Sequence, residues 1–137
     1  MDNTLLFLLA VFILALVAVA FMSFGAKRPS RLNQAWFAQQ WASIEAQFKD
    51  GKAGQQLAVV NADKLLDKAM RDLRYKGNTM GERLKSHSKN FKNINAIWSA
   101  HKLRNRIAHE SNISVSAEEV KRALHDLKNG LKDIGAL

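Results

Sequence analysis

Three side chains in the segment HKLRNRIAHE, residues 101–110, have the types and spacing that RNA cleavage requires. Histidine titrates near neutral pH, so His109 could take the proton of a ribose 2′-hydroxyl. A guanidinium is permanently charged and planar, so Arg104 could hold the scissile phosphate and the charge that grows on it. Asn105 lies four residues before His109 on one helix face, where its amide could orient the imidazole or the ribose.

The angular separation of Arg104 and His109 bears on how such a site would be completed. Five residues correspond to about 140° around a straight helix. Either the long arginine side chain reaches the histidine near the helix end, or both groups meet their counterparts across a two-fold axis. The leaving oxygen also needs a second proton donor, and one chain supplies one such histidine and one such arginine. We therefore expect a homodimer.

A purely structural role for Arg104 is the alternative. On a helical wheel this arginine falls within an apolar arc, and a desolvated charge without a partner is very unfavourable. Asp63 or Asp67 on the preceding long helix could pair with it and tie the bundle together. His109 would then be a solvent-facing residue at a helix C-terminus, where the helix dipole favours a cation.

The segment RNRIAH, residues 104–109, resembles the RNxxxH motif of HEPN domains, which are compact helical bundles. The resemblance covers about residues 55–137, from NADKLLDKAM through WSAHKLRNRIAHE to the last helix. It implies that Arg104, Asn105 and His109 of two protomers form one composite cleft and that the chain is a metal-independent endoribonuclease. Some HEPN domains serve only as binding or dimerisation modules, so a non-catalytic module is the alternative.

Other side chains could bind RNA. Basic and aromatic residues in the 75–92 segment could follow an RNA backbone and stack on bases, although such a charge run is more commonly a solvated face. The group comprises Lys76, Arg83, Lys85, His87, Lys89 and Lys92, with Tyr75 and Phe91. Within it and on the motif helix we expect substrate contacts from Lys85, Lys89, His101 and Arg106. There is no cysteine, phosphate-binding glycine loop or HExxH motif, and we expect no cofactor and no metal.

The N-terminus predicts a membrane anchor. Residues 5–24 contain no charge and only Ser23 is polar, and 20 helical residues span about 30 Å, the thickness of a hydrocarbon core. The acidic start and the length of the run argue against a removable signal peptide. Lys27, Arg28 and Arg31 follow the run and no Lys or Arg precedes it. Positively charged residues that flank a membrane span usually lie on its cytoplasmic side, so this distribution predicts a single-pass inner-membrane protein with its C-terminal domain in the cytoplasm.

The rest of the chain is strongly basic. Residues 27–137 hold all 21 Lys and Arg and 11 of the 12 acids, a net charge of +10. Such a charge suits an acidic partner, either nucleic acid or an anionic membrane surface. We expect RNA as the partner, with the membrane contacted through the single N-terminal helix.

Apolar spacing predicts an all-α chain with a transmembrane segment over 1–26, a short basic linker over 27–32 and a helical bundle over 33–137. The segment DGKAG should separate the first two bundle helices, with Leu57 and Val60 among the apolar positions of the second. Capping boxes should begin helices at Thr79 and Ser116. We expect an antiparallel, HEPN-like bundle with helices over 31–49, 55–75, 79–89, 93–110 and from 116 onward.

Overall fold

A computed structural model describes residues 3–24 and 32–137, and every regular element in these ranges is a helix. The chain divides into two compact units, Met1–Arg31 and Leu32–Leu137. Residues 27–31 of the predicted linker lie outside the described residues. The elements are α1 (Asn3–Phe24), α2 (Gln34–Phe48), α3 (Gly51–Asp72), α4 (Met80–Ser86), the short 3₁₀ helix η1 (Ser88–Asn90), α5 (Ile94–His109) and α6 (Ala117–Asp133). The all-helical class predicted from the sequence is confirmed.

The N-terminal helix α1 is long and apolar enough, by length and composition, to cross a membrane. Its large apolar side chains between Leu5 and Val19 are exposed, Leu14 to 70%.

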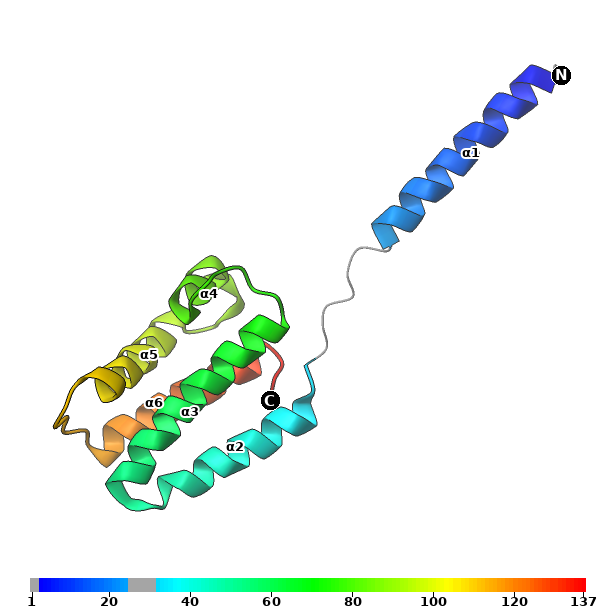
Figure 1. The fold of residues 1–137 in the computed structure, drawn as a ribbon. Coiled ribbons are helices and arrows are strands. Elements are labelled where there is room, and N and C mark those ends of the chain that lie inside the picture. The colour runs from blue at the N-terminus through cyan, green and yellow to red at the C-terminus, as the bar shows by residue number, and fades with distance from the viewer. Residues whose placement is uncertain (1–2, 25–31) are drawn as a thin grey trace. The chain divides into compact units, whose positions relative to one another are not determined.

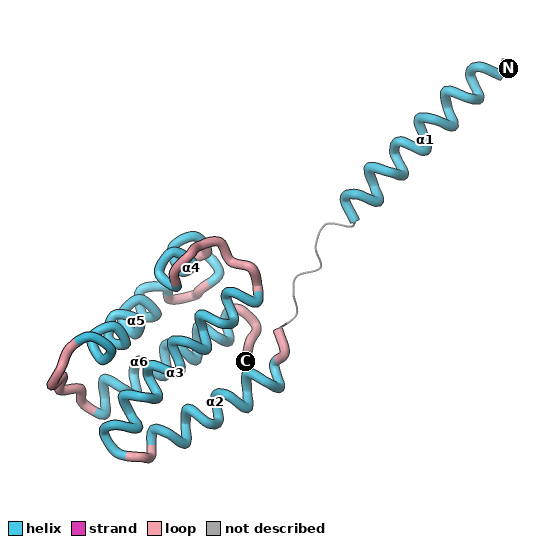
Figure 2. Tube along the Cα trace, viewed as in Figure 1, coloured by secondary structure: helices cyan, strands magenta, loops and turns pink. Residues whose placement is uncertain are grey.

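The core of the second unit is built around α3 (Figure 1). This helix packs against α2, α5 and α6, and α5 packs against α6. Figure 2 shows short loops joining α2 to α3 and α5 to α6, so that each pair forms a helical hairpin. On α2, Phe37, Trp41 and Ile44 lie three and four residues apart, and all three are buried. On α3 the prediction was wrong for Leu57, whose side chain is 48% exposed.

The connection between α2 and α3 is shorter than the sequence predicts. Only Lys49 and Asp50 lie between the helices, and Gly51 starts α3 with a φ of 71° that favours glycine. Gly54, expected in the loop, lies inside α3, where an added Cβ would collide with the backbone carbonyl of Gln47. The two glycines therefore allow a tight turn with closely packed helix ends, and α3 begins four residues earlier than predicted.

Side-chain caps fix the starts of the later helices. The capping box at Ser116 is confirmed, and hydrogen bonds from the Ser116 backbone and hydroxyl lower the pKa of Glu119. At α4 the Thr79 hydroxyl accepts the Glu82 N–H as predicted, at 3.2 Å. The Glu82 carboxylate instead accepts the N–H of Asn78, at 2.6 Å. The second half of this cap therefore lies one residue earlier than in a capping box.

The helices place different loops at the two ends of this unit. At the end where the chain enters at Leu32, the Gln34 amide donates to the Gly135 carbonyl at 3.0 Å and the Lys92 N–H donates to Asp133 at 2.9 Å. We call residues 32–35, 73–92 and 132–137 the entry end. The far end comprises residues 48–53 and 106–121, which hold the α2–α3 turn and the α5–α6 loop (Figure 1).

Candidate functional site

The RNRIAH segment occupies the last turns of α5. Asn93 caps the start of this helix by accepting the Ala96 N–H at 3.1 Å. Ile97, Ala100 and Leu103 are buried and fix the rotation of the helix on the domain. The other residues of the helix, including Arg104 directly after Leu103, therefore have set directions.

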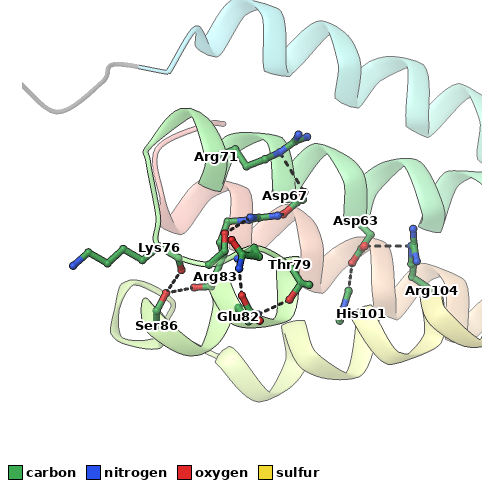
Figure 3. Close-up of polar contacts among 12 residues, drawn as sticks. Asp63, Asp67, Arg71, Lys76, Thr79, Glu82, Arg83, Ser86, His101 and Arg104 are labelled. Carbon is green, nitrogen blue, oxygen red and sulfur yellow. Dashed lines mark hydrogen bonds and ion pairs between the residues drawn. The ribbon is translucent and has the colours of Figure 1, made fainter.

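Asp63 of α3 binds two side chains of α5. Its Oδ1 lies 2.9 Å from His101 Nδ1, and its Oδ2 lies 3.5 Å from Arg104 Nε. Figure 3 shows the carboxylate contacting both of these side chains. Asp63 is 3% exposed, so its charge depends on these partners. Of the two acids considered from the sequence, Asp63 is the one that pairs with Arg104.

Asn105 joins Arg104 to His101. Arg104 Nη1 donates to the Asn105 Oδ1 at 3.0 Å, and Asn105 Nδ2 lies 3.4 Å from His101 Nε2. Together with Asp63 these residues form a closed polar network, which we call the Asp63 network. Within this chain the Asn105 amide contacts His101, one turn before Asn105, and not His109. A contact of Asn105 with the ribose stays a prediction.

Arg104 is held but not sealed from solvent. Its side chain is 25% exposed. Its Nε atom is buried and lies 3.5 Å from the Asp63 carboxylate. At this distance the two groups form an ion pair, but Nε has no hydrogen-bond partner in the described part of the chain. Asp63 and Asn105 therefore contact the guanidinium through Nε and Nη1, and the exposed part of the group could accept an anion.

His109 ends α5 and is exposed. Over the described ranges, 3–24 and 32–137, it has no hydrogen bond or ion pair. Arg106, one turn before it, lies 3.7 Å from Glu110 and lines a shallow pocket of about 280 Å³ between α5 and α6. Arg106 is thus on a different side of the helix from the Asp63 network, and its contact with substrate stays a prediction.

The 75–92 segment separates into buried and exposed residues. Arg83 and Phe91 are buried, which contradicts a role in RNA contact. Arg83 forms bonds of 2.9 and 2.7 Å to Asp67 and donates to the Gly77 carbonyl at 2.7 Å (Figure 3). Lys85 and Lys89 are exposed at the entry end, whereas His109 lies beyond the full length of α5, about 24 Å away along the helix. Substrate contact by these lysines stays a prediction.

Tyr75 and His87 form a rigid pair near these lysines. Their rings stack with centroids 3.9 Å apart and an interplanar angle of 4°. Asn90 donates to the Tyr75 hydroxyl at 2.6 Å, and Ser86 Oγ lies 2.7 Å from His87 Nδ1. The loop around α4 and η1 is therefore held by side-chain contacts and presents its lysines from a fixed backbone.

The burial of Arg83 has a measurable consequence. Arg83→Ala should lower the free energy of unfolding by about 3 kcal/mol, at the low end for breaking a buried pair because Arg71 stays 3.3 Å from Asp67. The matched exposed variant Lys85→Ala should change it by less than about 0.5 kcal/mol. Urea unfolding of both variants tests this, and equal stabilities would contradict the buried ion pair.

The Asp63 network could have been found from the sequence in part. His101, Arg104 and Asn105 have i, i+3 and i+4 spacing and share one face of α5, but only the packing of α3 on α5 brings Asp63 to them. Among the described residues no three His, Cys, Asp or Glu side chains lie close enough to hold a metal ion.

No family model, curated protein or solved structure matches the chain.

Proposed function

We propose that the chain is a membrane-tethered, metal-independent endoribonuclease with a HEPN-like antiparallel bundle that acts as a homodimer. α1 would anchor it in the inner membrane, with the bundle in the cytoplasm. The observation that carries the proposal is the last part of α5. There His109 is exposed and has no polar partner in the described chain. Arg104, five residues before it, is held by the Asp63 network while a quarter of its side chain stays exposed.

The proposed reaction is transesterification by the ribose 2′-hydroxyl. His109 of one protomer takes the hydroxyl proton, and the 2′-oxygen forms a bond to phosphorus. Arg104 binds the non-bridging oxygens, whose negative charge increases during the attack. The bond to the 5′-oxygen then breaks, and the second copy's His109 gives that oxygen a proton. The products are a 2′,3′-cyclic phosphate and a 5′-hydroxyl.

The proposal of two chains follows from the direction of the side chains. Arg104 is held toward α3 by Asp63, whereas His109 lies about 140° further around α5. A second copy related by a two-fold axis would supply the missing histidine to each arginine and place both copies of α5 at the interface.

The second candidate is a non-catalytic, membrane-anchored module that dimerises or binds RNA or protein. The ion pair between Asp63 and Arg104 favours it, because the same contact would stabilise a bundle that does no chemistry. In that case Arg104 would link α3 to α5, and His109 would be an ordinary exposed residue.

RNA cleavage without metal distinguishes the two functions. The full-length chain in detergent micelles, incubated with single-stranded RNA in EDTA, should produce fragments with 2′,3′-cyclic phosphate ends. An Arg104→Ala/His109→Ala double variant, purified in the same way, controls for contaminating ribonucleases and should produce none. Equal cleavage by both proteins, or no cleavage by the wild type, would contradict the endoribonuclease and favour the non-catalytic module.

A further inference from the structure

Charge is distributed unevenly between the two ends of the folded unit. The far end carries four exposed basic and four exposed acidic side chains: Lys49, Lys52, Arg106 and Lys121 against Asp50, Glu110, Glu118 and Glu119. At the entry end six basic side chains are exposed: Arg74, Lys76, Lys85, Lys89, Lys92 and Lys132. Glu82 is the one exposed side-chain carboxylate there, within the residues described. The entry end is therefore strongly cationic and the far end is neutral.

The entry end presents these cations on a fixed surface. The Ser86 hydroxyl donates to the Lys76 carbonyl at 2.6 Å and ties the end of α4 to the loop that follows α3. Asp133, whose side chain is 9% exposed, accepts the Lys92 N–H and holds α6 to the start of α5. Figure 3 shows the Lys76 side chain extending away from these helices. The lysines thus lose no backbone freedom when they meet a charged surface.

The chain reaches this unit at the cationic end. Residues 25–31 separate α1 from Leu32, and so short a segment spans less than about 30 Å even when fully extended. If α1 crosses a membrane, the entry end is therefore kept near the lipid headgroups. A cytoplasmic leaflet carries anionic lipids, and each basic residue close to it strengthens binding by about fivefold.

We infer that the entry end docks on an anionic membrane surface through Arg74, Lys76, Lys85, Lys89, Lys92 and Lys132, an inference that rests on the membrane tether of the proposed function. RNA phosphates would also attract these side chains, but the place where the tether joins the unit favours the membrane. Docking would direct α5 away from the bilayer and hold His109 at the outer end of the domain.

Quenching by lipid headgroups tests the docking in the full-length chain. The chain has no cysteine, so a single fluorophore can be attached at Asn78→Cys in the entry end or at Ser111→Cys in the far end. Each protein is placed in nanodiscs with nitroxide-labelled headgroups, either of phosphatidylcholine alone or with one quarter phosphatidylglycerol. We expect at least threefold more quenching at position 78 than at 111 in the anionic discs. The difference should disappear in 0.5 M salt, where charges are screened.

Charge reversal supplies the matched controls. Lys76→Glu/Lys85→Glu/Lys89→Glu should abolish the excess quenching, whereas Lys49→Glu/Lys52→Glu/Lys121→Glu at the far end should preserve it. Equal quenching at the two positions in both kinds of disc would overturn the docking. So would an entry-end variant that binds RNA more weakly while its quenching is unchanged, which would assign the surface to RNA. Co-elution of the wild type with neutral discs tests the membrane tether separately. If the protein did not co-elute with them, α1 would not be a membrane anchor and the docking inference would be overturned with it.

Discussion

His109→Ala should slow RNA cleavage by about 10²–10⁴-fold, the contribution typical of a general acid or base. The same change should leave the free energy of unfolding within about 0.5 kcal/mol of the wild type, as is usual for an exposed residue. His109 lies at the last position of α5 and makes no polar contact within the described residues, so its removal leaves the core unchanged. Single-turnover cleavage in EDTA and urea unfolding in the same micelles measure the two effects.

A second exposed histidine provides the control for this experiment. His125 lies on α6, where its Nε2 is 3.0 Å from the Asn129 amide, away from α5's last turn. His125→Ala should cleave RNA at the wild-type rate. If His109→Ala also kept that rate, His109 would have no part in the reaction. A loss common to both variants would indicate general damage rather than loss of a proton-transfer group.

Removing both side chains that contact Asp63 should cause the largest loss of stability. The double variant His101→Ala/Arg104→Ala leaves a carboxylate that is 3% exposed without a charged partner, which should cost about 3–5 kcal/mol. Adding Asp63→Asn removes the buried charge, so the triple variant should be more stable than the double variant. Arg104→Ala alone should cost only about 1 kcal/mol, because the contact between His101 and Asp63 persists. Urea unfolding of the full series measures these steps.

An exposed ion pair shows what the same change does without burial. Lys68 and Asp72 are 2.9 Å apart, with side chains 41% and 38% exposed. Lys68→Ala should cost less than about 1 kcal/mol, and adding Asp72→Asn should recover nothing. A triple Asp63 variant no more stable than its parent double variant would show that solvent or another group already satisfies the carboxylate.

The helices of the domain could be predicted from local signals. Apolar residues three and four apart gave the buried face of α2, and side-chain caps at Asn93 and Ser116 fix the starts of α5 and α6 near the predicted residues. The predicted length of the α2–α3 turn is wrong, because a glycine at position 54 suggests the end of a loop while the structure places Gly54 inside α3. In the structure this glycine is needed for the close approach of Gln47, a contact that only the packed hairpin defines.

The candidate site was less accessible to sequence reasoning because it depends on pairing between helices. Asp63 and Asp67 are one turn apart on α3, and either could have met Arg104. In the structure Asp63 contacts His101 and Arg104, whereas Asp67 pairs with Arg83. The burial of Arg83 could have been inferred from its place beside Met80 and Leu84 on one helix face. Cleavage of RNA and dimerisation involve molecules outside a single chain and stay predictions.

The two-residue connection between α2 and α3 also bears on the order in which the chain folds. Closing so short a loop costs little chain entropy, and contacts between neighbouring helices form quickly. Synthesis proceeds from the N-terminus, so the α2–α3 hairpin can form once residue 72 has left the ribosome. Asp63 is then already outside the ribosome when His101 and Arg104 emerge from it. The anionic half of the network is thus available as a docking point before α5 emerges, and α5 folds onto a surface that left the ribosome earlier.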